Sequence, residues 1–573
     1  MPYDHEAVDL YTKGDFGAFF NRASLVPEDF IVQALVARCY FRGMGVSLDP
    51  EKGRALLDQI KKEISDRAFH EIGIVEFIFG LQFDGGWGNQ EDFGLAFQWY
   101  QKAVGHGCVA AINNLAGLYK KGLGVAADSK VALALYRQAA DKGSGLAANN
   151  LGQMYRDGCG VDQDVGLAAM WFRVSALSNN PGGQLNLAKA FYQGAGVAEN
   201  KELAVYWCTK AAENNSRDAS YWLGEMYLKG DDVPKNERQG IFWIEKSAEL
   251  GSARAFDRLG RIYGDGTLGI KEFGKAKMCL EKAVTLGWKS AKYHLAILLL
   301  KNRTEGDNLE SGFVWLTKAV IDGDRQALSL LEKTVERGLA IAQWHMGHLC
   351  EKGMGVEQSN EKYVCLIRSA AEKGYAKAQI DLGAMFIEGN YVAQNENEGV
   401  KWYQRAADAG DKDAEYYLAS CFDGGVGCVQ DDSMAYMWYR KAAEQGHATA
   451  QFNVGSMLLA GRGCQKDQSQ AVEWFVKAAV NGDADAMVNV GWAYETGIGV
   501  EKDYNKAVKW YKQAAEVGND LGQLNLGLCY MYGRGIEIDK EEAAHWLGLS
   551  SDQGNEQAIK SLIRLGTGWG YRR

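Results

Sequence analysis

A short motif that returns every 36 residues constrains the fold of this chain more than any other feature. One series of an apolar residue followed by Gly or Ala runs from Leu115 to Leu295, and a second series runs from Met346 to Leu526, both in steps of 36. The two series are offset by 51 residues, so about 15 extra residues lie between Leu295 and Met346. Self-similarity with a period of roughly 20–50 residues indicates a repeat architecture.

The unit at 486–518 shows what one repeat is built from. Its first half places Ala486, Val490 and Tyr494 on one face of a helix. Gly497 and Gly499 follow, and glycine ends helices readily because it adopts the left-handed cap conformation at little cost. The first half is therefore predicted to be a short helix that ends in a turn.

The second half of the same unit predicts another helix. Asp503 stands where an N-cap would satisfy the free backbone amides. A second apolar face follows, formed by Ala507, Trp510, Tyr511, Ala514 and Ala515. A single helix hairpin cannot bury both of its faces, so the units are expected to stack into an all-α solenoid, with the recurring aromatic pairs in its core.

The complete motif reads A-x-x-x-L-G-x-x-Y-x-x-G-x-G-V-x-x-D-x-x-K-A-x-x-W-Y-x-x-A-A-x-x-G. It is clearest at 147–179, 414–446, 450–482, 486–518 and 522–554. The pattern resembles the Sel1-like repeat family, whose members are relatives of tetratricopeptide repeats, and the resemblance covers roughly residues 34–565. It implies a right-handed superhelical solenoid of tandem helix-turn-helix repeats. It also implies scaffold or adaptor work that holds protein partners, and it offers no catalytic residue to carry over.

Breaks in the repeat suggest how the chain is organised. We expect an N-terminal capping segment at 1–33, with a helix around Ala7–Phe20, and a first repeat arm at 34–323. The inserted residues 324–338 form a helix-sized half-unit that is either a neutral duplication scar or a hinge and docking elbow. A second arm at 339–556 and a C-terminal cap and tail at 557–573 complete the scheme.

Composition narrows the class of protein. The net charge of −10 argues against a general nucleic-acid surface or a surface for anionic membranes. No run approaches the roughly 18 apolar residues of a membrane helix, and no targeting segment is visible. The 11 cysteines recur at no fixed spacing, which favours reduced thiols and a cytoplasmic location.

The best functional candidate is a row of residues, two before each key apolar residue. At 100° per residue this position lies 160° from the key residue, so by analogy with tetratricopeptide repeats it faces a concave groove. In the second arm all six such residues are apolar: Trp344, Ile380, Tyr416, Phe452, Val488 and Leu524. The position five after the key residue alternates acidic and apolar side chains, with acids at Glu351, Asp423 and Glu495.

This row suits a bound helix or extended peptide with apolar anchors and basic flanks. The alternative is that the curvature of the superhelix buries the row between adjacent first helices. We therefore predict a non-catalytic scaffold for a protein partner, with no cofactor, no metal, no nucleic acid, no membrane insertion and no small-molecule substrate. A second hypothesis is a neutralising protein of the immunity type that clamps a toxin or effector.

A third hypothesis, a cryptic hydrolase or redox enzyme, depends on two residue pairs. His345 and His348 are spaced i, i+3 on a predicted first helix, but zinc prefers three or four ligands and no third follows. Cys421 and Cys428 are seven residues apart and could form a redox pair. The repeated Gly-x-Gly-Val has neither the preceding strand nor the Gly-Lys-Ser/Thr of a phosphate-binding loop, so it is interpreted as a turn.

Overall fold

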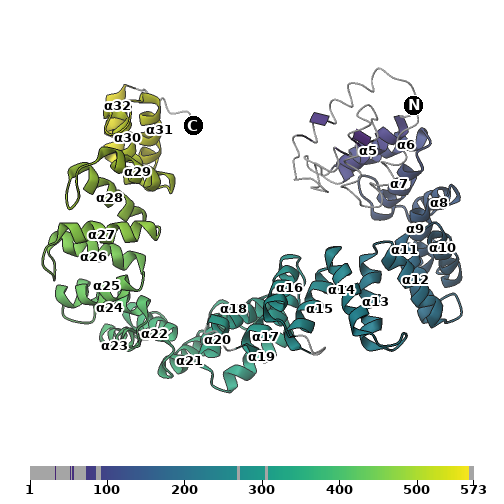
Figure 1. Ribbon diagram of the computed structural model, residues 1–573, viewed down its shortest axis with the longest axis horizontal. Coiled ribbons are helices and arrows are strands. Elements are labelled where there is room, and N and C mark those ends of the chain that lie inside the picture. Colours follow the sequence, from purple (N-terminus) through teal and green to yellow (C-terminus); the bar gives the residue numbers. More distant parts are fainter. Residues whose placement is uncertain are drawn as a thin grey trace. The chain divides into compact units, whose positions relative to one another are not determined.

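The computed structural model describes residues 72–84, 92–266, 271–302 and 307–566, together with a few isolated positions before residue 57. Regular structure in these residues is entirely helical and comprises 28 helices (Figure 1). The expected capping helix around Ala7–Phe20 and the tail after Gly566 lie outside the described residues. The prediction of an all-α solenoid of helix hairpins is confirmed.

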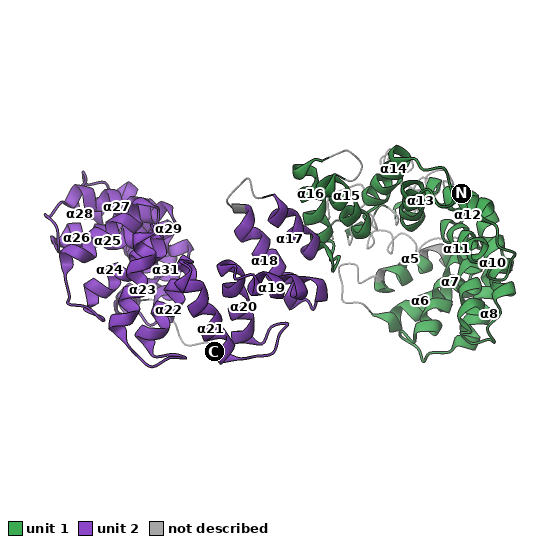
Figure 2. Ribbon diagram, turned by 90° about the horizontal axis from the view of Figure 1, so that it is seen from below, with its two compact units in different colours: residues 1–291 green, residues 292–573 purple. Residues whose placement is uncertain are grey.

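The chain divides into two compact units, residues 1–291 and 292–573 (Figure 2). The helices of the first unit are α5 (Ile72–Asp84), α6 (Phe93–Gly105), α7 (Val109–Lys121), α8 (Ser129–Asp141), α9 (Gly145–Asp157), α10 (Val165–Leu177), α11 (Pro181–Gln193), α12 (Lys201–Glu213), α13 (Arg217–Lys229), α14 (Glu237–Glu249), α15 (Ala253–Asp265) and α16 (Phe273–Thr285).

The second unit begins at the second residue of α17 and contains the remaining helices. They are α17 (Ala291–Lys301), α18 (Asp307–Ile321), α19 (Arg325–Glu336), α20 (Ala340–Lys352), α21 (Asn360–Glu372), α22 (Ala376–Glu388), α23 (Glu396–Asp408), α24 (Lys412–Gly424), α25 (Asp432–Glu444), α26 (Ala448–Ala460), α27 (Gln468–Val480), α28 (Ala484–Thr496), α29 (Tyr504–Glu516), α30 (Asp520–Tyr532), α31 (Lys540–Asp552) and α32 (Glu556–Leu565).

Local sequence signals account for the helix ends. Asp503 accepts a hydrogen bond from the backbone N–H of Lys506 and caps α29, as predicted. Gly497 ends α28 in the left-handed conformation with φ of 79°. The second glycine of the turn is required for a different reason. A Cβ on Gly463 would collide with the backbone carbonyl of Asp432, at the start of the preceding second helix. The turns that carry this second glycine therefore lie directly against the previous repeat.

The core between the two helices of a hairpin depends on a small residue opposite a large one. A Cβ added to Gly491 in α28 would lie 2.6 Å from the ring of Tyr511 in α29. Tyr511 is almost fully buried, as are Ala514 and Ala515 beside it. The aromatic ring thus fills the space that glycine leaves in its own hairpin.

The inserted segment forms one helix without a hairpin partner. Helix α19 packs against α18 and α20, and α18 also contacts α20 directly. Ala327 and Leu331 of α19 are fully buried in a cluster with Leu316 and Ala342. The half-unit is therefore part of the continuous core of the second unit. Its role as an elbow between two arms, and the predicted boundaries at 324 and 338, remain predictions.

Candidate functional site

The predicted row of six apolar residues is not an exposed stripe. Trp344, Ile380, Tyr416 and Phe452 are half-buried, whereas Val488 and Leu524 are buried at 8% and 3% exposure. Ile380, Tyr416 and Phe452 pack against the same hydrophobic cluster that contains Val488. Of the two interpretations that the sequence left open, this burial favours a row packed between first helices, and a role of the row in binding a partner remains a prediction.

Hydrogen bonds show where this row lies. In the first unit Asn150 donates to Asn113 at 3.0 Å, and Asn186 donates to Asn149 at 2.8 Å. Each bond joins the row position of one repeat to the position just before the key residue of the next repeat. The row therefore forms a seam between successive first helices. The angle from the key residue alone could not decide between the groove and this seam, because a first helix also packs against the repeats on either side.

The position one residue further along the chain, which carries the seam donors Asn150 and Asn186 in the first unit, is less engaged in part of the second unit. In the second unit the residue directly before the key residue is Tyr417, Asn453, Asn489 and Asn525 in four successive repeats. Tyr417 is 41% exposed, and the three asparagines are half-buried. Neither Asn489 nor Asn525 forms a side-chain hydrogen bond within the described part of the chain. Their amide groups are therefore available to a partner.

Aromatic side chains extend this less engaged surface. Trp492 lies one turn after Asn489 on α28 and is 37% exposed, and Tyr532 at the end of α30 is also exposed. We call Tyr417, Asn453, Asn489, Trp492, Asn525 and Tyr532 the amide face. The sequence signal for it was the recurrence of Asn every 36 residues at an uncharged, non-core position.

The predicted acidic residues are already engaged by their own chain. Arg462 binds Asp423 at 2.9 Å and Arg534 binds Glu495 at 2.7 Å, and each arginine belongs to the turn of the following repeat. Tyr511 also donates to Glu495 at 2.8 Å. These acids therefore link successive repeats, and a role for them in binding the basic flanks of a partner remains a prediction.

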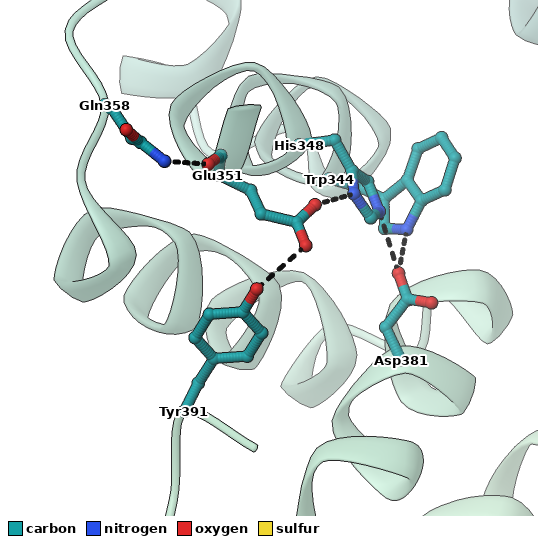
Figure 3. A network of polar contacts seen from close by, with 6 residues as sticks. All are labelled: Trp344, His348, Glu351, Gln358, Asp381 and Tyr391. Atoms are coloured by element: carbon teal, nitrogen blue, oxygen red, sulfur yellow. Dashed lines mark hydrogen bonds and ion pairs between the residues drawn. The ribbon is translucent and has the colours of Figure 1, made fainter. Parts of the chain in front are cut away.

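Glu351 and Trp344 belong to a polar network at the start of the regular repeats of the second unit (Figure 3). The indole of Trp344 donates to Asp381 Oδ2 at 2.6 Å, and His348 Nε2 lies 3.0 Å from the same oxygen. His348 Nδ1 lies 3.1 Å from Glu351, which also accepts from Tyr391. Burial alone would lower the pKa of His348, but its hydrogen bonds with Asp381 and Glu351 outweigh burial and raise it.

The two histidines that the sequence placed together have different environments. His345 is buried, its Nδ1 lies 3.0 Å from the Thr317 hydroxyl, and its ring stacks on Phe313. Burial lowers the pKa of His345 to about 4. Across the described ranges, no three His, Cys, Asp or Glu side chains gather as a metal site would require.

The cysteine pair has little nucleophilic character. Burial raises the pKa of Cys421 to about 12 and also raises that of Cys428. A thiol is reactive as the thiolate, so both side chains remain in the protonated, unreactive form near neutral pH. Both are free thiols. No described helix is long and apolar enough to span a bilayer.

Comparisons with known proteins place the chain. The family model for the Sel1 repeat matches residues 31–60, 81–108, 109–144, 145–180, 181–216, 217–252, 257–288, 340–375, 376–411, 412–447, 448–483, 484–519 and 521–555. No curated protein matches the chain.

Three solved structures illustrate what the chain is similar to. The protective antigen c5321 of uropathogenic Escherichia coli, described as displaying an SLR fold, is 28% identical over 83% of this chain and 91% of its own, with a TM-score of 0.38. A Sel1 repeat protein from Oxalobacter formigenes is 26% identical over 63% of this chain and 90% of its own, with a TM-score of 0.37. The immunity protein Pa5087 from Pseudomonas aeruginosa is 22% identical over 39% of this chain and 86% of its own, with a TM-score of 0.30. Thirteen matched repeats span well over half of the sequence, and on that evidence the chain belongs to the Sel1 repeat family.

Proposed function

We propose that this protein is a non-catalytic scaffold that holds an extended segment of a protein partner along the amide face of its second unit. The observation that carries the proposal is the row of unpaired amides at Asn489 and Asn525, next to the exposed ring of Trp492. A side-chain amide both donates and accepts hydrogen bonds. It therefore complements the backbone N–H and C=O groups of a peptide.

The same chemistry favours an extended segment over a helix. The backbone groups of a helix already bond to one another, whereas those of an extended segment are free. The amides of Asn489 and Asn525 lie in adjacent repeats and would meet backbone groups about three residues apart on an extended segment, and Tyr417, Trp492 and Tyr532 would supply apolar contacts beside them. The predicted apolar row then supports this surface from beneath, since Phe452 and Val488 pack in the seam next to Asn453 and Asn489.

A random peptide library displayed on phage tests the proposal with the full chain as bait. Peptides selected by the wild-type chain are expected to bind Asn489→Leu/Asn525→Leu at least about tenfold more weakly, because each lost amide removes about 1 kcal/mol. Asn505→Leu, on the exposed surface of the second helix α29, is the matched control and should leave binding unchanged. Circular dichroism confirms that each variant is folded.

Three outcomes would reject the proposal. Peptides that bind the double variant as tightly as the wild type would remove the amide face from the site. Selection of no peptide would reject an extended segment as the ligand. Tight one-to-one binding of a folded protein, with no peptide of that protein able to compete, would support a clamp for a folded partner instead.

A further inference from the structure

Four successive second helices of the first unit carry exposed apolar residues at one repeating position. Met170, Tyr206, Phe242 and Met278 follow one another at intervals of 36 residues on α10, α12, α14 and α16. Each is between 47% and 63% exposed. The buried residues of each helix lie on its opposite side, such as Ala168 and Phe172 of α10. These four side chains therefore point away from the core of their own hairpins.

Neighbouring residues widen the row into a patch. Leu167 and Leu203 are exposed one turn before Met170 and Tyr206, and Leu177 at the end of α10 is 73% exposed. We call these seven residues the apolar stripe: Leu167, Met170, Leu177, Leu203, Tyr206, Phe242 and Met278. Figure 2 shows the four helices in the first unit. With roughly 150–250 Å² for a large side chain, the stripe exposes on the order of 700 Å². That exceeds what soluble monomers usually leave uncovered.

The repeat itself does not require an apolar residue at this position. In the second unit the equivalent residues are Val314, Cys365, Lys401, Met437, Glu473, Lys509 and His545. Four of the seven are charged or titratable polar side chains, and Val314 and Met437, at 36% and 37% exposure, are the large apolar ones. Most hairpins of the second unit therefore form with a polar outer face, so a run of four large exposed apolar residues is a feature of the first unit.

We propose that the apolar stripe binds the same stripe on a second copy of this chain, through a two-fold contact. In such a contact each residue of one copy meets its symmetry partner on the other. The row Met170–Tyr206–Phe242–Met278 nearly reads the same in both directions. A two-fold axis between α12 and α14 therefore brings Met170 against Met278 and Tyr206 against Phe242. The exposed area per copy is close to the roughly 800 Å² that each partner contributes to a standard interface.

Charges along one border of the stripe fit the same axis. Glu202 and Arg238 occupy the same position in successive repeats, are exposed, and have no ion pair in the described part of the chain. The axis brings Glu202 of each copy to Arg238 of the other. The same axis brings Arg173 of each copy to Glu281 of the other, and these two residues also occupy one equivalent position of the repeat. Like charges also approach at Lys210 and Lys246, but Glu213 already neutralises Lys210 at 2.9 Å.

The surrounding charges do not favour a lipid surface. A membrane-binding apolar face is usually bordered by Lys and Arg. Here Glu202, Glu245 and Glu281 stand among the basic residues on the same helices. A second copy of the chain would cover the apolar area and would also pair these acidic residues with basic ones.

Sedimentation velocity of the full chain over a range of concentrations tests the proposal. The wild type is expected to dimerise with a micromolar or tighter dissociation constant. Phe242→Lys should raise that constant at least about tenfold, because it places an ammonium group against Tyr206 of the other copy. Met437→Lys makes the same kind of change at the equivalent position of the second unit and should have no effect. Circular dichroism verifies that each variant retains its helices.

A charge exchange tests the two-fold register itself. Glu202→Arg alone places an arginine of one copy against Arg238 of the other. Arg238→Glu alone places a glutamate of one copy against Glu202 of the other. Each variant should therefore dimerise more weakly than the wild type. An equimolar mixture of the two should recover dimers, since each heterodimer restores both opposite-charge pairs. A mixture no better than either variant alone overturns the proposed contact. So does a wild-type chain that stays monomeric at about 100 μM, including one that binds anionic vesicles through Phe242.

Discussion

The two units of this protein are built from one repeat, yet they differ at two of its positions. On the outer face of the second helices, the first unit presents Met170, Tyr206, Phe242 and Met278, where the second presents residues such as Lys401 and Glu473. The repeat holds the core constant and leaves these positions free. The differences between the units therefore indicate where each one makes its own contacts.

At the seam between first helices the second unit is the more apolar of the two, whereas on the outer face of the second helices it is the more polar. The row position two before the key residue is apolar throughout the second unit and ends in the buried Leu524. In the first unit Asn113 and Asn149 occupy it and accept hydrogen bonds from the next repeat. The same position thus joins repeats through hydrogen bonds between side-chain amides at Asn113 and Asn149, and mainly through hydrophobic packing from Ile380 to Leu524. The predictions below test whether the shared packing between repeats stabilises both units equally, and whether the two seams contribute differently to stability.

The largest effect is expected where the two units are alike, at the second glycine of the turn. Gly196→Ala in the first unit and Gly463→Ala in the second should each reduce the free energy of unfolding by about 3 kcal/mol or more. Both residues have positive φ, and a Cβ on either would collide with the backbone of the preceding repeat. Urea unfolding followed by circular dichroism measures the loss.

Open turns provide the control for this prediction. Gly143 and Gly482 also have positive φ, but a Cβ on either has no neighbour within 4 Å. Alanine there should cost only about 1–2 kcal/mol, the conformational strain alone. Equal losses at all four glycines would show that close packing between repeats does not determine the requirement for glycine.

Next in size is truncation of the apolar seam at its buried end. Leu524→Ala should lower the free energy of unfolding by about 2–3 kcal/mol, because Leu524 is 3% exposed and packs with Leu547 and Ala558. Leu521→Ala, on the exposed side of the same helix, is the matched control and should change little. Thermal unfolding monitored by circular dichroism distinguishes the two. A small effect of Leu524→Ala would mean that the apolar row contributes little to the stability of the second unit.

These seams show how much of the molecule the sequence could predict. Periodicity alone predicted the hairpins, the caps such as Asp503 and the helix-sized insertion that became α19, because all of them depend on local residue patterns. Contacts between repeats could not be predicted from local patterns in the same way. The arginines that neutralise Asp423 and Glu495 lie 39 residues further along, in turns whose position depends on the stacking of the repeats. The candidate surface was displaced for the same reason, since Tyr417 and not Tyr416 lies on the amide face.

Acid should affect the second unit through His345, a residue without a counterpart in the repeat pattern. Burial, helped by Lys377 and His348 and opposed by Glu310, lowers the pKa of His345 to about 4. Its neutral form is therefore favoured in the folded state. The resulting stabilisation is complete above the ordinary pKa of about 6.5 and is lost as the pH falls toward 4. At pH 5 the loss should be about 2 kcal/mol.

Comparison of the wild type with His345→Gln isolates this contribution. Between pH 7.5 and pH 5 the wild type should lose about 2 kcal/mol more stability than the variant, as measured by urea unfolding at both pH values. His348, whose pKa is raised by Asp381 and Glu351, acts in the opposite sense in both proteins and cancels in the difference. Identical pH dependence of the two proteins would show that protonation of His345 does not influence unfolding.

The smallest effect is expected at the polar seam of the first unit. Asn149→Ala removes the acceptor of the 2.8 Å hydrogen bond from Asn186 and should cost about 1 kcal/mol. In a double-mutant cycle, Asn149→Ala and Asn186→Ala should couple by a similar amount, because each alone leaves the other amide unpaired. A coupling near zero would mean that these amides do not join the repeats. The first helices of the first unit would then be held together by apolar packing alone, as they are at Leu524. The two seams would differ in which residues they contain but not in how they stabilise the repeats.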